Sequence, residues 1–271
     1  MKRLKIPYYN LEGKELGTSD LPSVFETPFR PDVIRKVYVA LSTHARQPQG
    51  RDPMAGMKTS ASTFNPPTGR GIARVARVKG ERYQRAGQAA GIASVVKGRQ
   101  AHPPISEKLV SKDINDKERR LATASAVAAT ASLEIVKNRG HRVEGVPSLP
   151  LVVSDDIQSI LKARDLRSVF KNLGLLNDLE RAGSKRIVSG KSRARGRATK
   201  YRIGPLLVVQ QDLGIMKAAG GFPGVGCVLA KNLSVLELAP GSHPGRLAIW
   251  SRSALGALPE SLLALGDRYA S

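Results

Sequence analysis

The chain has 271 residues and carries 44 Lys and Arg against 22 Asp and Glu, a formal net charge of +22 at pH 7. With 41% hydrophobic residues, a chain of this length can bury a core in one large or two small domains, which excludes wholesale disorder. The single cysteine, Cys227, excludes an internal disulfide framework, and no apolar run approaches the roughly 20 residues of a membrane-spanning helix.

The N-terminal region predicts one strand and one helix. Leu4 to Tyr9 has the pattern of a strand, whereas Asn10 to Asp20 is typical of turns. From Pro31 to His44 the apolar residues recur at helical spacing, and proline is suited to a first helical turn. We therefore expect a helix that ends near His44.

Residues 44–104 differ from the regions on either side. They contain eight Gly and six Pro with no sustained period, so they do not form one regular element. They also carry 11 Lys and Arg against two acidic residues, a net charge of +9. A loop this long is unusual in a compact domain, which indicates a functional segment or a linker.

Regular structure resumes after this loop. Asn115 is positioned to cap a helix, and six alanines between Leu121 and Ala131 favour helix formation. Gly140 is a plausible C-terminal stop. We therefore expect an alanine-rich helix between the cap and this glycine.

The C-terminal half alternates between short apolar runs and helical spacings. The expected strands are Leu149–Val153, Leu206–Val209, Val225–Ala230 and Leu247–Trp250. The expected helices are Ile157–Leu161, Leu166–Leu173, Asn232–Leu238 and Ser253–Leu265. Unbroken apolar runs are typical of strands covered on both faces of a parallel sheet. The pattern predicts one three-layer α/β domain over residues 1–271, with a mostly parallel sheet and the long basic extended loop 44–104 inserted in it.

A second basic segment covers residues 185–202. It has eight Lys and Arg and no acidic residue, so the chain outside the two basic segments carries a net charge of only +5. Concentrated positive charge favours a polyanionic partner, because neutralised phosphates release condensed counterions. An anionic membrane would favour a bulky apolar helix face, which these Gly-, Ala- and Arg-rich segments lack. We therefore expect nucleic acid as the partner.

Arginine dominates the long basic loop, and guanidinium groups bind phosphates bidentately and stack on bases. Tyr201 adds an aromatic ring to the second segment. The candidate RNA-binding residues are Arg46, Arg51, Lys58, Arg70, Arg74, Arg77, Lys79, Arg82, Arg85, Lys97, Arg99, Lys191, Arg193, Arg195, Arg197, Lys200, Tyr201 and Arg202.

No established catalytic or phosphate-loop motif is present at the required spacing, and we expect no cofactor and no metal. Gly220–Gly226 precedes a strand and is interpreted as a turn, and Asp155 and Asp156 are positioned to cap the next helix. The histidines are widely separated and are interpreted as ordinary surface residues: His44, His102, His141 and His243.

Several short motifs together resemble a known family. They are Leu21–Pro28, Thr68–Gly71, Lys97–Pro104, Ile114–Arg119, Val152–Asp156 and Leu238–Gly241. The sequence is similar to universal large-subunit ribosomal protein number four. The chain ends at Ser271 without the long C-terminal extension of eukaryotic members, which favours the archaeal type.

The resemblance implies a structural, non-enzymatic role in the large ribosomal subunit, in the cytoplasm. It implies early binding to several domains of the large-subunit ribosomal RNA, neighbouring large-subunit proteins, and contact with the nascent polypeptide in the exit tunnel. The residues that this resemblance assigns to the tunnel wall are Thr68, Gly69, Arg70, Gly71, Ile72, Ala73 and Arg74.

Two alternatives remain at this point. One is an RNA-modifying or RNA-hydrolysing enzyme with a site near Asp155 and Asp156 and with basic arms that hold the substrate. The other is a DNA-compacting protein, which the lack of repeats and of a groove-reading module disfavours.

Overall fold

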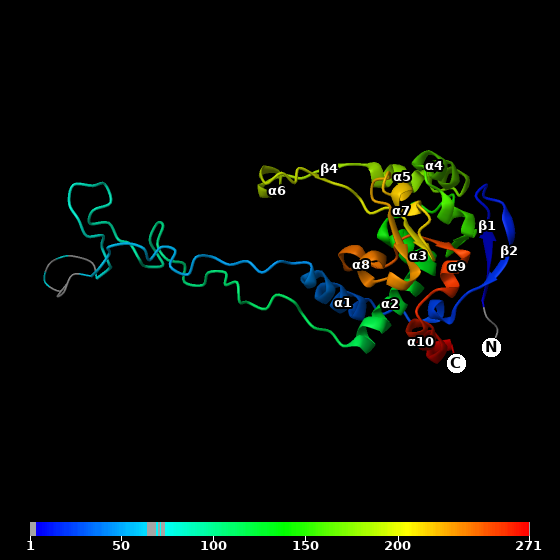
Figure 1. The fold of residues 1–271 in the computed structure, drawn as a ribbon, viewed down its shortest axis with the longest axis horizontal. Coiled ribbons are helices and arrows are strands. Elements are labelled where there is room, and N and C mark those ends of the chain that lie inside the picture. The colour runs from blue at the N-terminus through cyan, green and yellow to red at the C-terminus, as the bar shows by residue number, and fades with distance from the viewer. Residues whose placement is uncertain (1–3, 64–68, 70, 72–73, 271) are drawn as a thin grey trace. The chain divides into compact units, whose positions relative to one another are not determined.

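The computed structural model describes residues 4–63, 69, 71 and 74–270 (Figure 1). The chain divides into two compact units. Met1–Ser42 and Asp113–Ser271 together form the first, which we call the α/β domain, and Thr43–Lys112 forms the second, which we call the loop unit.

The α/β domain is built on one sheet, with strand order β2-β1-β3-β8-β6-β7 among the described residues (Figure 1). The strands of this sheet are β1 Lys5–Tyr9, β2 Glu15–Asp20, β3 Leu151–Val153, β6 Leu206–Val209, β7 Gly226–Leu229 and β8 Ala248–Ser251. Only β1 and β2 pair antiparallel within it, and every other neighbouring pair is parallel. The expected mixed α/β domain with a mostly parallel sheet is confirmed.

The helices separate these strands along the chain (Figure 1). The α-helices are α1 Pro31–His44, α2 Asp116–Ala131, α3 Leu133–Arg139, α4 Ala163–Asn172, α5 Leu176–Gly183, α6 Lys191–Ala194, α7 Ile215–Ala219, α8 Val235–Leu238, α9 Arg252–Gly256 and α10 Glu260–Ala270. The 3₁₀ helices are η1 Ser23–Glu26, η2 Asp155–Ser159, η3 Ala230–Asn232 and η4 Pro240–Ser242.

Both faces of the central strands are buried. Val208 and Trp250 belong to an apolar cluster that includes residues of α1, α2, α8, α9 and α10. Leu207 and Ile249, the alternate residues of the same strands, belong to a second cluster with residues of α3, α4 and α7. Since successive side chains of a strand point to opposite faces, the sheet lies between two helical layers.

The expected turns over Asn10–Asp20 are partly wrong, because residues Glu15–Asp20 form β2. This strand lies at the edge of the sheet and is mostly exposed, so it lacks the apolar alternation that signals a half-buried strand. Asn115 occupies the N-cap position of α2 as expected, but its side chain makes no capping hydrogen bond. Gly140 ends α3 in the left-handed conformation, as expected.

Four of the expected helices differ in detail. The alanine-rich helix expected between Asn115 and Gly140 is divided at Ser132 into α2 and α3. Ile157–Leu161 forms only the 3₁₀ helix η2, and the helix expected over Asn232–Leu238 is divided between η3 and α8. The helix expected over Ser253–Leu265 is divided into α9 and α10. Pro259 lies directly before α10, and a proline disfavours helical geometry in the residue before it.

The loop unit consists of two chain limbs that run beside each other (Figure 1). The amide of Lys112 donates to Oγ1 of Thr43 at 3.0 Å. Further along, the amide of Arg51 donates to the carbonyl of Pro104 at 3.2 Å, and Nη1 of Arg51 donates to Oε1 of Gln100 at 2.7 Å. These bonds hold the two limbs together over much of their length.

Part of the loop unit forms a small hydrogen-bonded core. Arg77 pairs antiparallel with Ser62 on one side and with Ala89 on the other. Val78 and Ala90 are buried there, although residues of this segment have no regular hydrophobic period. The segment is therefore locally ordered without being a strand or a helix of ordinary length.

Candidate nucleic-acid interface

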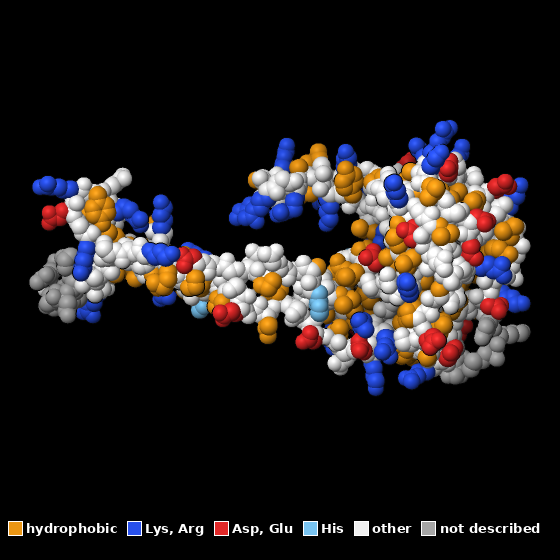
Figure 2. Space-filling model, viewed as in Figure 1, with side chains coloured by type: hydrophobic (Ala, Val, Ile, Leu, Met, Phe, Trp, Pro, Cys, Tyr) orange, Lys and Arg blue, Asp and Glu red, His pale blue; other side chains and the backbone are white. Residues whose placement is uncertain are grey.

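The loop unit displays most of its candidate RNA-binding side chains to solvent (Figure 2). The exposed members are Arg46, Arg51, Lys58, Arg74, Lys79, Arg82, Arg85, Lys97 and Arg99. Lys58 forms an ion pair with Asp52 at 2.7 Å, and the pair lies in solvent. An exposed pair of this kind contributes little to stability, so a phosphate can compete for the ammonium group.

Arg77 is the exception among these cations. Its side chain is half-buried, and Nη1 donates to the carbonyl of Gly87 at 2.8 Å. Its backbone amide and carbonyl both pair with Ser62 at 3.0 Å. Arg77 therefore stabilises the small core of the loop unit in this structure rather than presenting a free guanidinium group.

Close packing of the two limbs explains one pair of glycines. A Cβ atom on Gly56 would overlap the backbone of Gly98, and a Cβ atom on Gly98 would overlap the carbonyl of Ile92. A larger residue at Gly56 would push the two limbs apart, whereas a larger residue at Gly98 would clash within its own limb. These two glycines thus allow close packing of the backbone at this point.

The residues assigned to the tunnel wall, 68–74, fall near the middle of residues 44–104 in the sequence. Gly69, Gly71 and Arg74 are exposed, and a Cβ atom added at either glycine would meet no atom within 4 Å. Thr68, Arg70, Ile72 and Ala73 lie outside the described residues.

The second basic segment belongs to the α/β domain and forms a hairpin over residues 185–202. Its two strands, β4 Arg186–Ile187 and β5 Thr199–Lys200, pair antiparallel. The short helix α6 lies between them, and Figure 2 shows Lys and Arg side chains gathered over this hairpin. The exposed candidate cations are Lys191, Arg193, Arg195, Arg197, Lys200 and Arg202.

Tyr201, expected to stack on a base, already has a partner in the hairpin. Nζ of Lys185 lies 5.8 Å from the centre of its ring, within the range of a cation–π interaction. The exposed ring is therefore in part engaged by the protein's own cation.

A buried arginine holds the base of this hairpin, and the sequence analysis missed it. Arg246 is 5% exposed, and its guanidinium group donates to the carbonyls of Gly204, Pro205, Gly224 and Glu237 at 2.9–3.3 Å. Burial lowers the pKa of Arg246 to about 10, so the group stays charged at neutral pH. No sequence motif marks a residue whose ligands are backbone carbonyls from separate segments.

A second buried cluster contacts the same base of the hairpin, at Ile203. Arg181 donates from Nη2 to the carbonyl of Ile203 at 2.7 Å and from Nε to Oδ1 of Asp178 at 2.8 Å. Burial would raise the pKa of Asp178, but hydrogen bonds from His141 and Arg181 lower it to about 2. Both arginines thus fix where the basic hairpin leaves the domain.

The interpretation of all four histidines as surface residues is wrong for His141. It is 5% exposed, and its Nδ1 lies 3.0 Å from Oδ2 of Asp178. Burial lowers the pKa of His141 below its usual value. Asp178 lies 37 positions after His141 in the sequence, so no local motif could have predicted the pair.

The two acidic residues considered for catalysis are engaged in structural hydrogen bonds. Oδ1 of Asp155 accepts from the amide of Ser253 at 2.8 Å and from its Oγ at 2.6 Å, and it also accepts from Gln158. Oδ2 of Asp156 accepts from Oγ of Ser154 at 3.0 Å. Ser251 is the N-cap residue of α9, and Asp155 adds a second acceptor for the first turn of that helix instead of capping the helix that follows it in sequence, because β3 and β8 end side by side.

The described residues contain no cluster of three or more His, Cys, Asp or Glu that could hold a metal ion. None of the described helices has both the length and the apolar character of a membrane span. Gly220–Gly226 forms the expected turn between α7 and β7. Cys227 lies on β7 opposite Leu207, and burial raises the pKa of its thiol to about 12.

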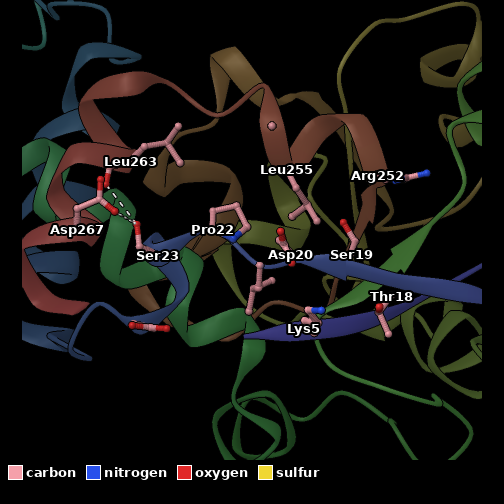
Figure 3. A pocket seen from close by; sticks show the side chains of 13 residues that line it. Lys5, Thr18, Ser19, Asp20, Pro22, Ser23, Arg252, Leu255, Leu263 and Asp267 are labelled. Atoms are coloured by element: carbon pink, nitrogen blue, oxygen red, sulfur yellow. Dashed lines mark hydrogen bonds between the residues drawn. The ribbon is translucent and has the colours of Figure 1, made fainter. Parts of the chain in front are cut away.

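A cavity lies between β2, η1 and the C-terminal helices (Figure 3). Its charged lining residues are Lys5, Asp20, Glu26, Arg252 and Asp267, and Oγ of Ser23 donates to Oδ1 of Asp267 at 2.7 Å. Three carboxylates and two cations do not form a phosphate-binding surface. None of the candidate RNA-binding residues lines this cavity.

An α/β domain with a mostly parallel sheet, two arginine-rich segments with mostly exposed described cations, and structurally engaged acidic residues together define a strongly basic α/β protein. The model of the ribosomal protein L4/L1 family matches residues 19–261, and the chain belongs to this family.

Curated archaeal relatives are similar over nearly their whole length. The large ribosomal subunit protein uL4 of Methanopyrus kandleri is 48% identical over 260 residues, covering 96% of this chain and 99% of the relative. The proteins of that name from Methanococcus aeolicus and Methanococcus vannielii are 44% and 43% identical, covering 93% and 95% of this chain and 97% and 99% of the relatives. The resemblance to the archaeal type is confirmed.

Proposed function

We propose that this protein is a structural constituent of the large ribosomal subunit that binds large-subunit ribosomal RNA through two basic segments. Residues 44–104 are an inserted, extended loop that penetrates the RNA, and residues 185–202 are a second RNA-binding element. The observation that carries the proposal is the segregation of charge: these segments account for most of the +22 net charge, and their described cations are almost all exposed.

The chemistry of the two segments suits packed RNA. Guanidinium groups bind phosphate oxygens with two parallel hydrogen bonds, and counterion release supplies a large, salt-dependent part of the affinity. Glycines such as Gly56 and Gly98 let two stretches of backbone lie close together, which suits a segment that passes between RNA helices. An extended segment of about 60 residues is long enough to contact several RNA domains, which supports a role early in assembly.

We also propose the partners that the family resemblance implies. They are the large-subunit ribosomal RNA, neighbouring large-subunit proteins and, through Thr68–Arg74, the nascent polypeptide in the exit tunnel. The protein acts on the ribosome in the cytoplasm. Its curated relatives are named as large ribosomal subunit proteins, which supports a structural rather than an enzymatic role.

The enzyme alternative lacks support from the candidate acidic residues. Asp155 accepts three hydrogen bonds from Gln158 and Ser253, and Asp156 accepts one from Ser154. A general base must be able to reach the proton of a substrate, and these carboxylates are already held by the protein.

The test compares two triple variants with the same change of charge. Arg193→Gln, Arg195→Gln and Arg197→Gln remove three cations of the hairpin, whereas Arg164→Gln, Arg167→Gln and Lys171→Gln remove three exposed cations of α4. Binding of each full-length protein to transcribed large-subunit ribosomal RNA is measured over a salt series. We expect the hairpin variant to bind more weakly, with the slope of log affinity against log salt smaller by about 2 to 3.

The α4 variant should retain the wild-type slope. Equal losses in the two variants would show that net charge alone, and not the hairpin, determines binding. Failure of the wild-type protein to sediment with large subunits would overturn the proposed function as a whole.

The tunnel contact has its own test. A photo-crosslinking residue at Gly71 should capture a stalled nascent chain on purified ribosomes, whereas the same residue at Arg193 should not. If ribosomes contain both variants and neither position crosslinks to the nascent chain, the tunnel assignment is contradicted.

A further inference from the structure

Tyr83 is an exposed aromatic residue in the loop unit that the candidate RNA-binding residues do not include. Its side chain is 46% exposed, although its ring is held in place. The phenol hydroxyl donates to the carbonyl of Lys79 at 2.7 Å. A Cβ atom on Gly80 would lie 2.6 Å from Cε1 of Tyr83, so the glycine allows the ring to fold back against the backbone.

The turn that carries Tyr83 is closed by backbone hydrogen bonds. The amide of Val78 donates to the carbonyl of Gln88 at 2.9 Å, and the amide of Gly87 donates to the carbonyl of Val78 at 3.1 Å. Within the turn, the amide of Ala86 donates to the carbonyl of Tyr83 at 3.0 Å. A ring fixed in this way loses little conformational freedom when a ligand packs on it.

The turn that carries Tyr83 also carries three exposed cations close to it in the sequence: Lys79, Arg82 and Arg85. Arg82 has a φ angle of 64°, a left-handed conformation that non-glycine residues adopt at a cost. The acidic residue Glu81 is the only negative charge between Asp52 and Glu107. The turn therefore combines a rigid aromatic ring with local positive charge.

The environment of Tyr83 differs from that of Tyr201. Lys185 approaches the Tyr201 ring, whereas no aromatic or cationic group of the described residues packs on the ring of Tyr83. An open ring next to phosphate-binding cations suits an unpaired nucleotide, which offers a base face and a phosphate together.

We propose that Tyr83 stacks on an unpaired base of RNA, with Lys79, Arg82 and Arg85 binding the adjoining phosphates. The inference rests on the proposed function and extends it, because it assigns single-stranded rather than helical RNA to this turn.

The experiment compares Tyr83→Phe with Tyr83→Leu in the full-length protein. Both variants lose the hydrogen bond to Lys79, but only phenylalanine keeps an aromatic ring, so their difference reports stacking. The probe is transcribed large-subunit ribosomal RNA over a salt series. We expect Tyr83→Phe to bind within about threefold of the wild type and Tyr83→Leu to bind about 5- to 150-fold more weakly, with an unchanged salt slope.

Arg82→Gln is the matched control, since it should lower the salt slope by about 1. Equal affinities of Tyr83→Phe and Tyr83→Leu would overturn the stacking inference, even where wild-type binding keeps the proposed function intact. Unchanged RNA affinity together with loss of a neighbouring protein from assembled subunits would also overturn it, in favour of a protein contact. Absence of RNA binding by the wild type would instead contradict the proposed function itself.

Discussion

Nδ1 of His141 lies 3.0 Å from Oδ2 of Asp178, and both side chains are almost fully buried. Because a carboxylate only accepts hydrogen bonds, the imidazole nitrogen is the donor of this pair. The same carboxylate accepts from Arg181, which in turn donates to the carbonyl of Ile203 directly after the basic hairpin. A buried pair in the domain thus supports the position of the exposed basic hairpin.

This pair makes folding stability depend on pH. Burial lowers the pKa of His141, so the unfolded chain takes up a proton more readily below about pH 6.5 and stability falls from there. The lowered pKa of Asp178 adds a second loss as the pH falls from about 4 toward about 2. Urea denaturation between pH 3 and 8 should show a flatter dependence between pH 6.5 and 4 in His141→Gln. The control His243→Gln changes an exposed histidine, and its pH dependence should match that of the wild type. Identical pH dependences of stability for the wild type, His141→Gln and His243→Gln would refute the prediction.

Arg246→Met should destabilise the α/β domain. The substitution keeps an apolar chain of similar length but removes the guanidinium donor from the carbonyls of Gly204, Pro205 and Gly224. The carbonyls of Pro205 and Gly224 keep a backbone donor, whereas the buried carbonyl of Gly204 loses its guanidinium partner. Loss of one partner from buried polar groups costs about 2 to 5 kcal/mol. The measurement is the free energy of unfolding in urea.

Arg252→Met is the control for this change. Arg252 is exposed and lies 4.9 Å from the centre of the Tyr8 ring, an interaction worth about 1 kcal/mol or less. Similar losses from the two substitutions would show that the buried contacts of Arg246 are not what stabilises the domain.

Deletion of residues 45–101 should leave the α/β domain folded. Both apolar clusters of that domain consist of residues outside the deleted segment. The hydrogen bond between Thr43 and Lys112 lies outside the deletion and can still close the shortened loop. Calorimetry should show one cooperative unfolding transition, whereas a gradual loss of structure without a heat-capacity peak would contradict the expectation.

Asp155→Ala should weaken the domain rather than abolish a reaction. The side chain accepts hydrogen bonds from the amide and hydroxyl of Ser253 in the first turn of α9, and loss of a hydrogen bond costs about 0.5 to 1.5 kcal/mol. Thermal denaturation measures the loss of stability. Asp165→Ala, at an exposed position in α4, should lower the stability less than Asp155→Ala. An RNA-cleaving or RNA-modifying activity of the wild type that is absent from Asp155→Ala would revive the enzyme alternative.

The parallel core of the fold could be predicted because its strands are covered on both faces. An unbroken apolar run such as Leu206–Val209, flanked by glycine-rich turns and helical spacings, is typical of a strand buried on both faces of a parallel sheet. Strand β2 could not be predicted in this way, since an exposed edge strand is held by backbone pairing with β1 and needs no apolar pattern. Pro259 shows a different limit: the helical period continues across it, but the helix does not.

The charged segments were predictable and their internal contacts were not. Charge segregation is a property of the sequence alone, so cations such as Arg193 and Arg82 could be identified without a structure. Arg77 looks the same in sequence, and only the pairing with Ser62 and Gly87 shows that it stabilises the loop unit. Arg246 was missed because nothing in its sequence neighbourhood distinguishes a buried cation from a surface one.

The thiol of Cys227 has a practical consequence. With a pKa of about 12 and a position in β7, it reacts slowly with alkylating reagents while the sheet is intact. Because the chain has no second cysteine, the rate of alkylation reports the opening of this one strand from β6. Pulse labelling during synthesis would therefore time the completion of the sheet against the arrival of the protein on its RNA.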